Sequence, residues 1–89
     1  MKDKVIVFTM KGCPWCQTLK EELNEKGITY EERDVDDYSE MYEKFVKITE
    51  NEYLPSVLIG KNALVPEKSF KTIDECVGSI QRILLEHDR

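Results

Sequence analysis

A short apolar run followed by two cysteines at the start of a helix constrains the fold of this chain most strongly. The run Val5–Phe8 lies within Lys4–Thr9 and predicts a buried strand. Gly12 can supply an unusual backbone angle in the following loop. Pro14 suits the first position of a helix, because its missing N–H would be unpaired there, and Gly27 is placed to end that helix.

The middle of the chain predicts an edge strand and a second helix. Thr29–Val35 is heavily charged, which discourages pairing with another sheet edge. Asp37–Glu40 resembles a weak capping box that would open the helix. The apolar stripe expected on this helix is Met41, Tyr42, Phe45, Val46 and Ile48.

The last third of the chain predicts a hairpin and a final helix. Ser56–Ile59 follows Pro55 and would form a third strand, which pairs with a short strand around residues 63–65. Residues 66–71 are expected to be a loop, and Thr72–Glu75 forms a capping box for the last helix. Its expected buried face is Ile73, Cys76, Val77, Ile80, Ile83 and Leu84.

The order of these elements is βαβ, then α, then ββα. The first unit implies two parallel strands with a right-handed crossover, and the later hairpin makes the sheet mixed. We therefore expect an α/β protein with a thioredoxin-like fold, a mixed four-stranded sheet flanked by three helices. A chain of 89 residues has room for one domain, spanning residues 1–89.

Charge and composition exclude several classes of function. The net charge of −5, with basic residues dispersed among acids, argues against a nucleic-acid partner. No stretch approaches the length of a membrane span, and the apolar run after Lys4 is too short for a secretory signal. Three cysteines are too few for a disulfide scaffold. We expect a cytoplasmic monomer without a membrane partner.

The spacing of Cys13 and Cys16 points to redox chemistry. Only a thiolate attacks a disulfide, so a working thiol needs a lowered pKa. Cys13 lies at a helix N-terminus, where free N–H groups favour negative charge, and Lys11 adds positive potential. Cys16 falls in the first turn and faces the same way, so that the two sulfur atoms can form a disulfide.

Two other interpretations of the cysteine pair stay open at this point. A zinc site needs two further ligands, and the only other cysteine and histidine are Cys76 and His87. Cys76 lies on the apolar stripe of the last helix, so we expect it to be a buried core residue. We expect no catalytic role for His87. The pair could also be inert core cysteines, although Pro14 between them makes burial unfavourable.

The segment Phe8–Cys16 resembles the glutaredoxin active site, usually Cys-Pro-Tyr-Cys with a basic residue just upstream. Tyr53–Gly60 is similar to the glutaredoxin stretch Thr-Val-Pro-x-Val-Phe-Ile. Together the two segments extend the resemblance over about residues 4–84. The resemblance implies that Pro55 is cis and lies beside the cysteines, with the Leu54 backbone facing a substrate groove. It also implies that Trp15 flanks a glutathione groove; a trans Pro55 and a Trp15 that acts as a spacer are the alternatives.

Two positions depart from the glutaredoxin pattern. Lys68–Thr72 stands where many glutaredoxins carry Gly-Gly followed by Asp, and Thr72 is the nearest counterpart of that Asp. Its hydroxyl can accept a hydrogen bond from the glutathione ammonium, or cap the last helix, or do both. Glu52 stands where relatives often place a residue that meets the glycyl carboxylate, which a carboxylate would repel. Lys11, Lys47 and Lys71 could compensate.

The resemblance implies a glutathione-linked thiol–disulfide oxidoreductase with Cys13 and Cys16 as catalytic residues. Lys11, Trp15, Leu54, Pro55 and Thr72 are the expected glutathione contacts, and glutathione is the cosubstrate, with no metal. Protein disulfides, including that of ribonucleotide reductase, are the expected partners. One alternative is a redoxin that supplies ribonucleotide reductase and is reduced by thioredoxin reductase. Another is an iron–sulfur scaffold, which Pro14 disfavours.

Overall fold

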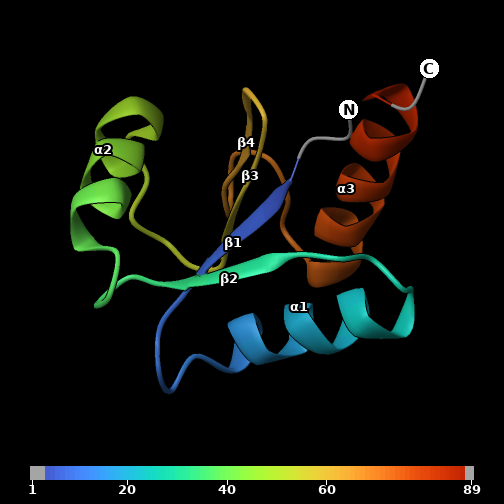
Figure 1. The fold of residues 1–89 in the computed structure, drawn as a ribbon, viewed down its shortest axis with the longest axis horizontal. Helices are drawn as coiled ribbons and strands as arrows, with labels where there is room; N and C mark the ends of the chain where they lie inside the picture. Colours follow the sequence, from blue (N-terminus) through green and yellow to red (C-terminus); the bar gives the residue numbers. More distant parts are fainter. Residues whose placement is uncertain (1–3, 88–89) are drawn as a thin grey trace.

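The computed structural model describes residues 4–87, with the backbone alone at His87. Each expected helix and strand is present (Figure 1). In chain order the elements are β1 (Val5–Thr9), α1 (Pro14–Glu25), β2 (Glu31–Asp34), α2 (Ser39–Thr49), β3 (Ser56–Ile59), β4 (Asn62–Leu64) and α3 (Ile73–His87). No helix in this part of the chain is both long and apolar enough to cross a membrane.

The four strands form one mixed sheet in the order β2-β1-β3-β4. β1 and β2 are parallel, with Val7 opposite Glu32, whereas β3 runs antiparallel to β1, with Val57 opposite Val7. β4 returns antiparallel to β3 and completes the hairpin. This topology confirms the expected fold class, and it leaves the charged strand β2 at an edge.

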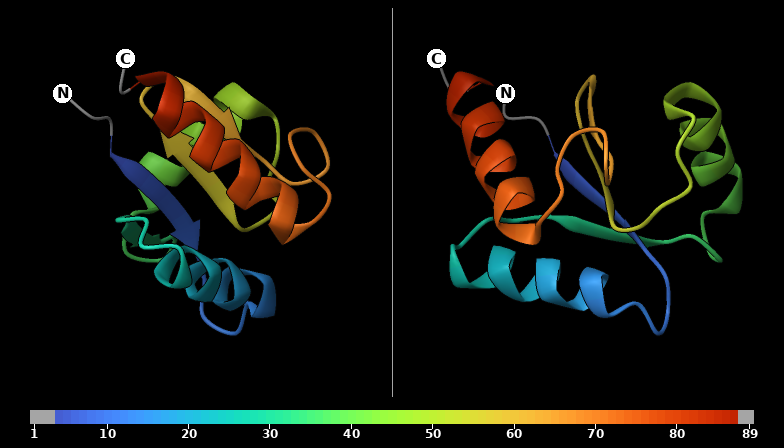
Figure 2. Two further views of the ribbon diagram at one scale, coloured as in Figure 1. Left: turned by 90° about the vertical axis from the view of Figure 1, so that its right-hand side faces the viewer. Right: turned by 180° about the vertical axis from the view of Figure 1, so that it is seen from behind.

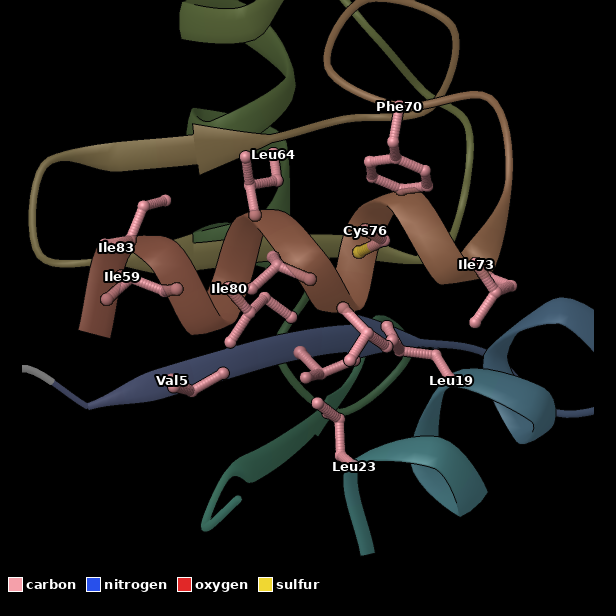
Figure 3. Close-up of a cluster of buried hydrophobic side chains, with 13 residues drawn as sticks. Val5, Leu19, Leu23, Ile59, Leu64, Phe70, Ile73, Cys76, Ile80 and Ile83 are labelled. Carbon is pink, nitrogen blue, oxygen red and sulfur yellow. The ribbon is translucent and has the colours of Figure 1, made fainter. Parts of the chain in front are cut away.

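The helices cover both faces of the sheet (Figure 2). α1 and α3 lie on one face and enclose the main core, to which Leu19 and Leu23 of α1 and Cys76 and Ile80 of α3 belong (Figure 3). α2 lies on the other face, where Phe45 packs against Phe8 with ring centroids 4.9 Å apart. The chain passes from β1 through residues 10–13 to α1 on the first of these faces.

Helix α2 differs from the expectation in its N-terminal cap and in its buried stripe. It begins at Ser39, and its N-cap residue Tyr38 makes no side-chain cap bond. The expected capping box is wrong because the preceding turn is built on Asp34, whose carboxylate accepts the Asp36 N–H and whose carbonyl accepts that of Tyr38. Ile48 was expected in the buried stripe but is 83% exposed, since Phe45 faces the sheet and Ile48 lies at the margin of that face.

Helix α3 begins as the sequence predicts. The Thr72 hydroxyl accepts the Glu75 N–H at 3.2 Å, and the Glu75 carboxylate accepts the Lys71 N–H at 2.7 Å. The expected buried face of α3 is also confirmed, with Leu84 partly buried. The N-terminus of α3 lies beside that of α1, because Pro14 and Trp15 line one hollow with Thr72.

Candidate active site

Cys13 and Cys16 are joined by a disulfide at the N-terminus of α1, with their Cα atoms 5.3 Å apart. Cys13 is the N-cap residue and has an extended backbone, and Pro14 occupies the first turn. The Cys13 sulfur accepts the Cys16 N–H at 3.1 Å. The sulfur thus fills the place of the usual cap oxygen. After reduction, this N–H and the helix dipole favour the thiolate of Cys13.

The two sulfur atoms differ in accessibility. Cys13 is partly exposed, whereas Cys16 is 2% exposed and lies on the buried face of α1 with Leu19 and Leu23. An incoming disulfide can therefore reach Cys13 but not Cys16. The geometry suits Cys13 to attack from solvent and Cys16 to attack the Cys13 sulfur from within.

The peptide bond between Leu54 and Pro55 is cis, as the resemblance implies. Hydrogen bonds hold the loop that carries it: the Tyr53 N–H donates to the Asn51 side chain and the Ser56 hydroxyl donates to the Tyr53 carbonyl, both at 2.8 Å. Asn51 also donates to the Pro66 carbonyl at 2.9 Å. Within residues 4–86, neither backbone polar group of Leu54 is hydrogen bonded to another residue. Both are available to an extended ligand.

A groove of about 510 Å³ lies between this loop, the start of α1 and the segment that connects β4 to α3. We call it the β4–α3 groove. Trp15 and Tyr53, 54% and 65% exposed, give it aromatic walls. Its full lining is Trp15, Tyr53, Leu54, Pro55, Pro66, Glu67, Phe70 and Lys71.

Glu67 and Lys71 bring opposite charges to the β4–α3 groove. Glu67 has a left-handed backbone, with φ of 73°, in a turn in which its N–H donates to the Phe70 carbonyl at 2.8 Å. The Lys68 ammonium donates to the Thr49 carbonyl at 2.8 Å and ties this turn to the end of α2. The groove can therefore meet a ligand that carries both an ammonium and a carboxylate group.

Three of the five expected glutathione contacts lie together in this groove: Trp15, Leu54 and Pro55. The other two do not line it. Thr72 caps α3 and lines a neighbouring hollow of about 370 Å³ with Trp15, and Lys11 is exposed in the loop before Cys13.

A second groove, of about 400 Å³, lies on the opposite side of Leu54, against α2. We call it the α2 groove. Glu52 and Lys47 line this groove, not the β4–α3 groove. Glu52 therefore lies on the other side of Leu54 from Trp15, and the expectation that its carboxylate opposes the glycyl end of glutathione stays a prediction.

Cys76 is fully buried in the main core, as expected (Figure 3). Burial raises the pKa of its thiol from 9.0 to about 12. A protonated thiol is a poor nucleophile and a poor metal ligand. Among the described side chains, no group of three His, Cys, Asp or Glu residues could hold a metal ion; the side chain of His87 lies outside that part.

The sequence interpretation missed Tyr53 and Glu67 as groove residues. Tyr53 was recognisable as an aromatic residue two positions before Pro55. Glu67 was not, because its position depends on the turn between β4 and α3, where no periodic pattern exists.

The mixed sheet, the cysteine pair at the first helix and the cis-proline in the adjoining groove define a protein of the thioredoxin-fold dithiol–disulfide class. The chain belongs to the glutaredoxin family, whose sequence model matches residues 5–64.

Glutaredoxin 1 of Rickettsia conorii is 43% identical over 44 residues, which are 48% of this chain and 43% of that protein. The chain therefore matches less than half the length of this curated relative. A buckwheat glutaredoxin solved in complex with glutathione superposes with a TM-score of 0.70 at 20% identity, over 94% of this chain and 78% of the other. The glutaredoxin-like NrdH-redoxin of Escherichia coli gives 0.63 at 22% identity, over 70% and 80%.

Proposed function

We propose that this protein is a glutathione-linked thiol–disulfide oxidoreductase that reduces protein disulfides and glutathione mixed disulfides. Membership of the glutaredoxin family and the close cysteine pair indicate thiol–disulfide chemistry in general. One observation carries the finer proposal: the accessible Cys13 sulfur at the start of α1 is bonded to the buried Cys16, beside a groove that contains cis-Pro55.

In the first step the Cys13 thiolate attacks one sulfur atom of the substrate disulfide. A bond forms between Cys13 and that sulfur, and the other substrate sulfur leaves as a thiolate and takes a proton. The Cys16 N–H points at the Cys13 sulfur and donates a hydrogen bond to it, which stabilises the attacking thiolate.

In the second step Cys16 loses its proton and attacks the Cys13 sulfur. The substrate is released as a thiol, and the Cys13–Cys16 disulfide remains, which is the form in this structure. Two glutathione molecules then restore the dithiol. The first forms a mixed disulfide with Cys13 and frees Cys16, and the second releases glutathione disulfide, so that two electrons pass from glutathione to the substrate.

The β4–α3 groove supports glutathione as the reductant. Glutathione carries an ammonium and a carboxylate at its γ-glutamyl end, and Glu67 and Lys71 supply one partner for each. Trp15 offers an apolar face to the rest of the tripeptide. The buckwheat glutaredoxin was solved with glutathione, which is consistent with the same ligand here.

The catalytic roles of Cys13 and Cys16, and the contacts of Lys11 and Thr72 with glutathione, remain part of this proposal. So does the assignment of residues 1–89 to one domain acting as a monomer. A dithiol is maintained in a reducing compartment, so we place the activity in the cytoplasm.

The test compares the wild type with Cys13→Ser and Cys16→Ser, using a glutathionylated peptide and a protein disulfide as substrates. We expect Cys13→Ser to lose both reactions, because Cys16 is buried. Cys16→Ser should keep deglutathionylation and lose reduction of the protein disulfide. Full activity of Cys13→Ser would refute the assignment.

A second candidate is a redoxin that serves ribonucleotide reductase and is reduced by thioredoxin reductase. The position of Thr72 favours it: the hydroxyl already accepts the Glu75 N–H as the cap of α3 and lines the hollow beside the β4–α3 groove, so it is less available to the glutathione ammonium. Turnover with glutathione and glutathione reductase is compared with turnover with thioredoxin reductase. Faster turnover with the flavoenzyme would replace the first proposal by the second.

A further inference from the structure

Asn51 is a buried polar residue that does not line the β4–α3 groove but is hydrogen bonded to two residues that do. It is 6% exposed. Its side-chain oxygen accepts the Tyr53 N–H at 2.8 Å, and its side-chain nitrogen donates to the Pro66 carbonyl at 2.9 Å. Burial of an amide costs free energy unless such bonds are made, so the two bonds account for an amide at this position.

The two partners of Asn51 belong to different walls of the groove. Tyr53 lies in the wall formed by the cis-proline loop, and Pro66 lies in the wall formed by the segment between β4 and α3. In the described part of the chain, no hydrogen bond joins residues 53–55 directly to residues 66–71. The amide of Asn51 is therefore the hydrogen-bonded link between the two walls.

The separation of the walls matters to a ligand that is bound at both of them. The backbone of Leu54 offers hydrogen bonds on the first wall, and Glu67 and Lys71 carry charges on the second. Pro66 directly precedes Glu67, so the bond from Asn51 holds the main chain next to the carboxylate. A shift of about 1 Å between the walls would lengthen hydrogen bonds beyond their useful range at one of them.

We propose that Asn51 is a positioning residue for glutathione: it holds the two walls of the β4–α3 groove at the separation that this ligand needs, without touching it. The Lys68 ammonium, which donates to the Thr49 carbonyl at 2.8 Å, is a second and more exposed tie of the same turn. The inference rests on the proposed function, because it assumes that glutathione occupies this groove. Weakening the link should lower the recognition of glutathione and leave the reactivity of Cys13 unchanged.

The test uses one peptide whose single cysteine forms a mixed disulfide either with glutathione or with 2-mercaptoethanol. In both reactions the Cys13 thiolate forms a bond to the sulfur of the small thiol, and the peptide leaves as a thiolate that takes a proton. The rate of peptide release by the reduced protein is measured with each disulfide. The ratio of the two rates is the glutathione preference, and the reactivity of Cys13 affects both rates alike.

Three variants separate the link between the walls from a general loss of stability. Asn51→Asp keeps the acceptor for the Tyr53 N–H but places an oxygen against the Pro66 carbonyl, and Asn51→Ala removes both bonds. Thr49→Ala is the matched control, because the bond that it removes, from the Thr49 hydroxyl to the Phe45 carbonyl, joins neither wall. We expect both Asn51 variants to lower the glutathione preference at least about fivefold, as loss of one hydrogen bond would give, and Thr49→Ala to keep it.

Lys68→Met keeps the inference testable if an Asn51 variant fails to fold, because the Lys68 bond is exposed. This variant should also lower the glutathione preference. A wild-type preference in every folded variant, or an equal fall in Thr49→Ala, would overturn the role of Asn51. A wild type that reacts equally with both peptides would instead refute glutathione as the ligand of the groove, and the role of Asn51 would fall with it.

Discussion

The buried thiol of Cys76 should make the folded protein less stable in alkaline solution. Burial raises the pKa of this thiol from 9.0 to about 12 in the folded state, whereas the unfolded chain exposes the thiol to water. Because the folded pKa is the higher one, the contribution of the protonated thiol to stability is complete below 9.0. It is lost progressively as the pH rises toward 12.

The size of the effect follows from proton linkage. At pH 10 the unfolded thiol is mostly ionised and the folded one is almost fully protonated, so ionisation favours the unfolded state about elevenfold. That ratio corresponds to about 1.4 kcal/mol relative to pH 7. The disulfide leaves Cys76 as the one thiol of the oxidised protein.

Denaturant unfolding of the oxidised wild type and of Cys76→Ala, each at pH 7 and pH 10, measures this loss. Tyrosine and lysine titrations affect both proteins alike, and the cavity left by the alanine costs the same at either pH. The wild type should therefore lose about 1.4 kcal/mol more than the variant between the two pH values. Equal losses would show that water reaches the thiol in the folded state and that the core around it is not closed.

Three further predictions concern stability. Leu23→Ala should lower the free energy of unfolding by about 3 kcal/mol, because Leu23 is fully buried in the main core; a loss under about 1 kcal/mol in denaturant unfolding would contradict that packing. Thr72→Ala should cost about 1 kcal/mol through loss of the cap to the Glu75 N–H, and Thr72→Ser should restore most of it in the same measurement. The pKa of Glu32 is lowered mainly by its hydrogen bond to Lys20. The contribution of this ion pair to the stability of the folded protein is therefore present above pH 4.5 and lost on acidification. It should amount to under about 1 kcal/mol because the side chain is 43% exposed, and in Lys20→Met an NMR titration should find the pKa of Glu32 moved toward 4.5.

The sequence predicted the elements whose patterns are local. The apolar run Val5–Phe8, the proline at the start of α1 and the capping box Thr72–Glu75 each act within a few residues, and all three lie where expected. The burial of Cys76 was also predictable, because the apolar spacing of α3 places it on the same face as Ile80.

The features that the sequence did not predict depend on the arrangement of distant segments. Ile48 matches the spacing of its helix but is 83% exposed, because its burial depends on how α2 packs against the sheet. Glu52 and Tyr53 are neighbours in sequence and line different grooves, because the cis-proline loop passes between the grooves. Glu67 reaches the site through a turn that the Asn51 and Lys68 side chains tie to neighbouring segments.

The two grooves have only Leu54 in common. Substitution of Lys71 or Glu67 therefore changes one groove and leaves the surface formed by Met10 and Val46 as it is. Substitution on that second surface likewise leaves the first groove as it is. A glutaredoxin built in this way can be redesigned one groove at a time, with the same pair of sulfur atoms kept in place.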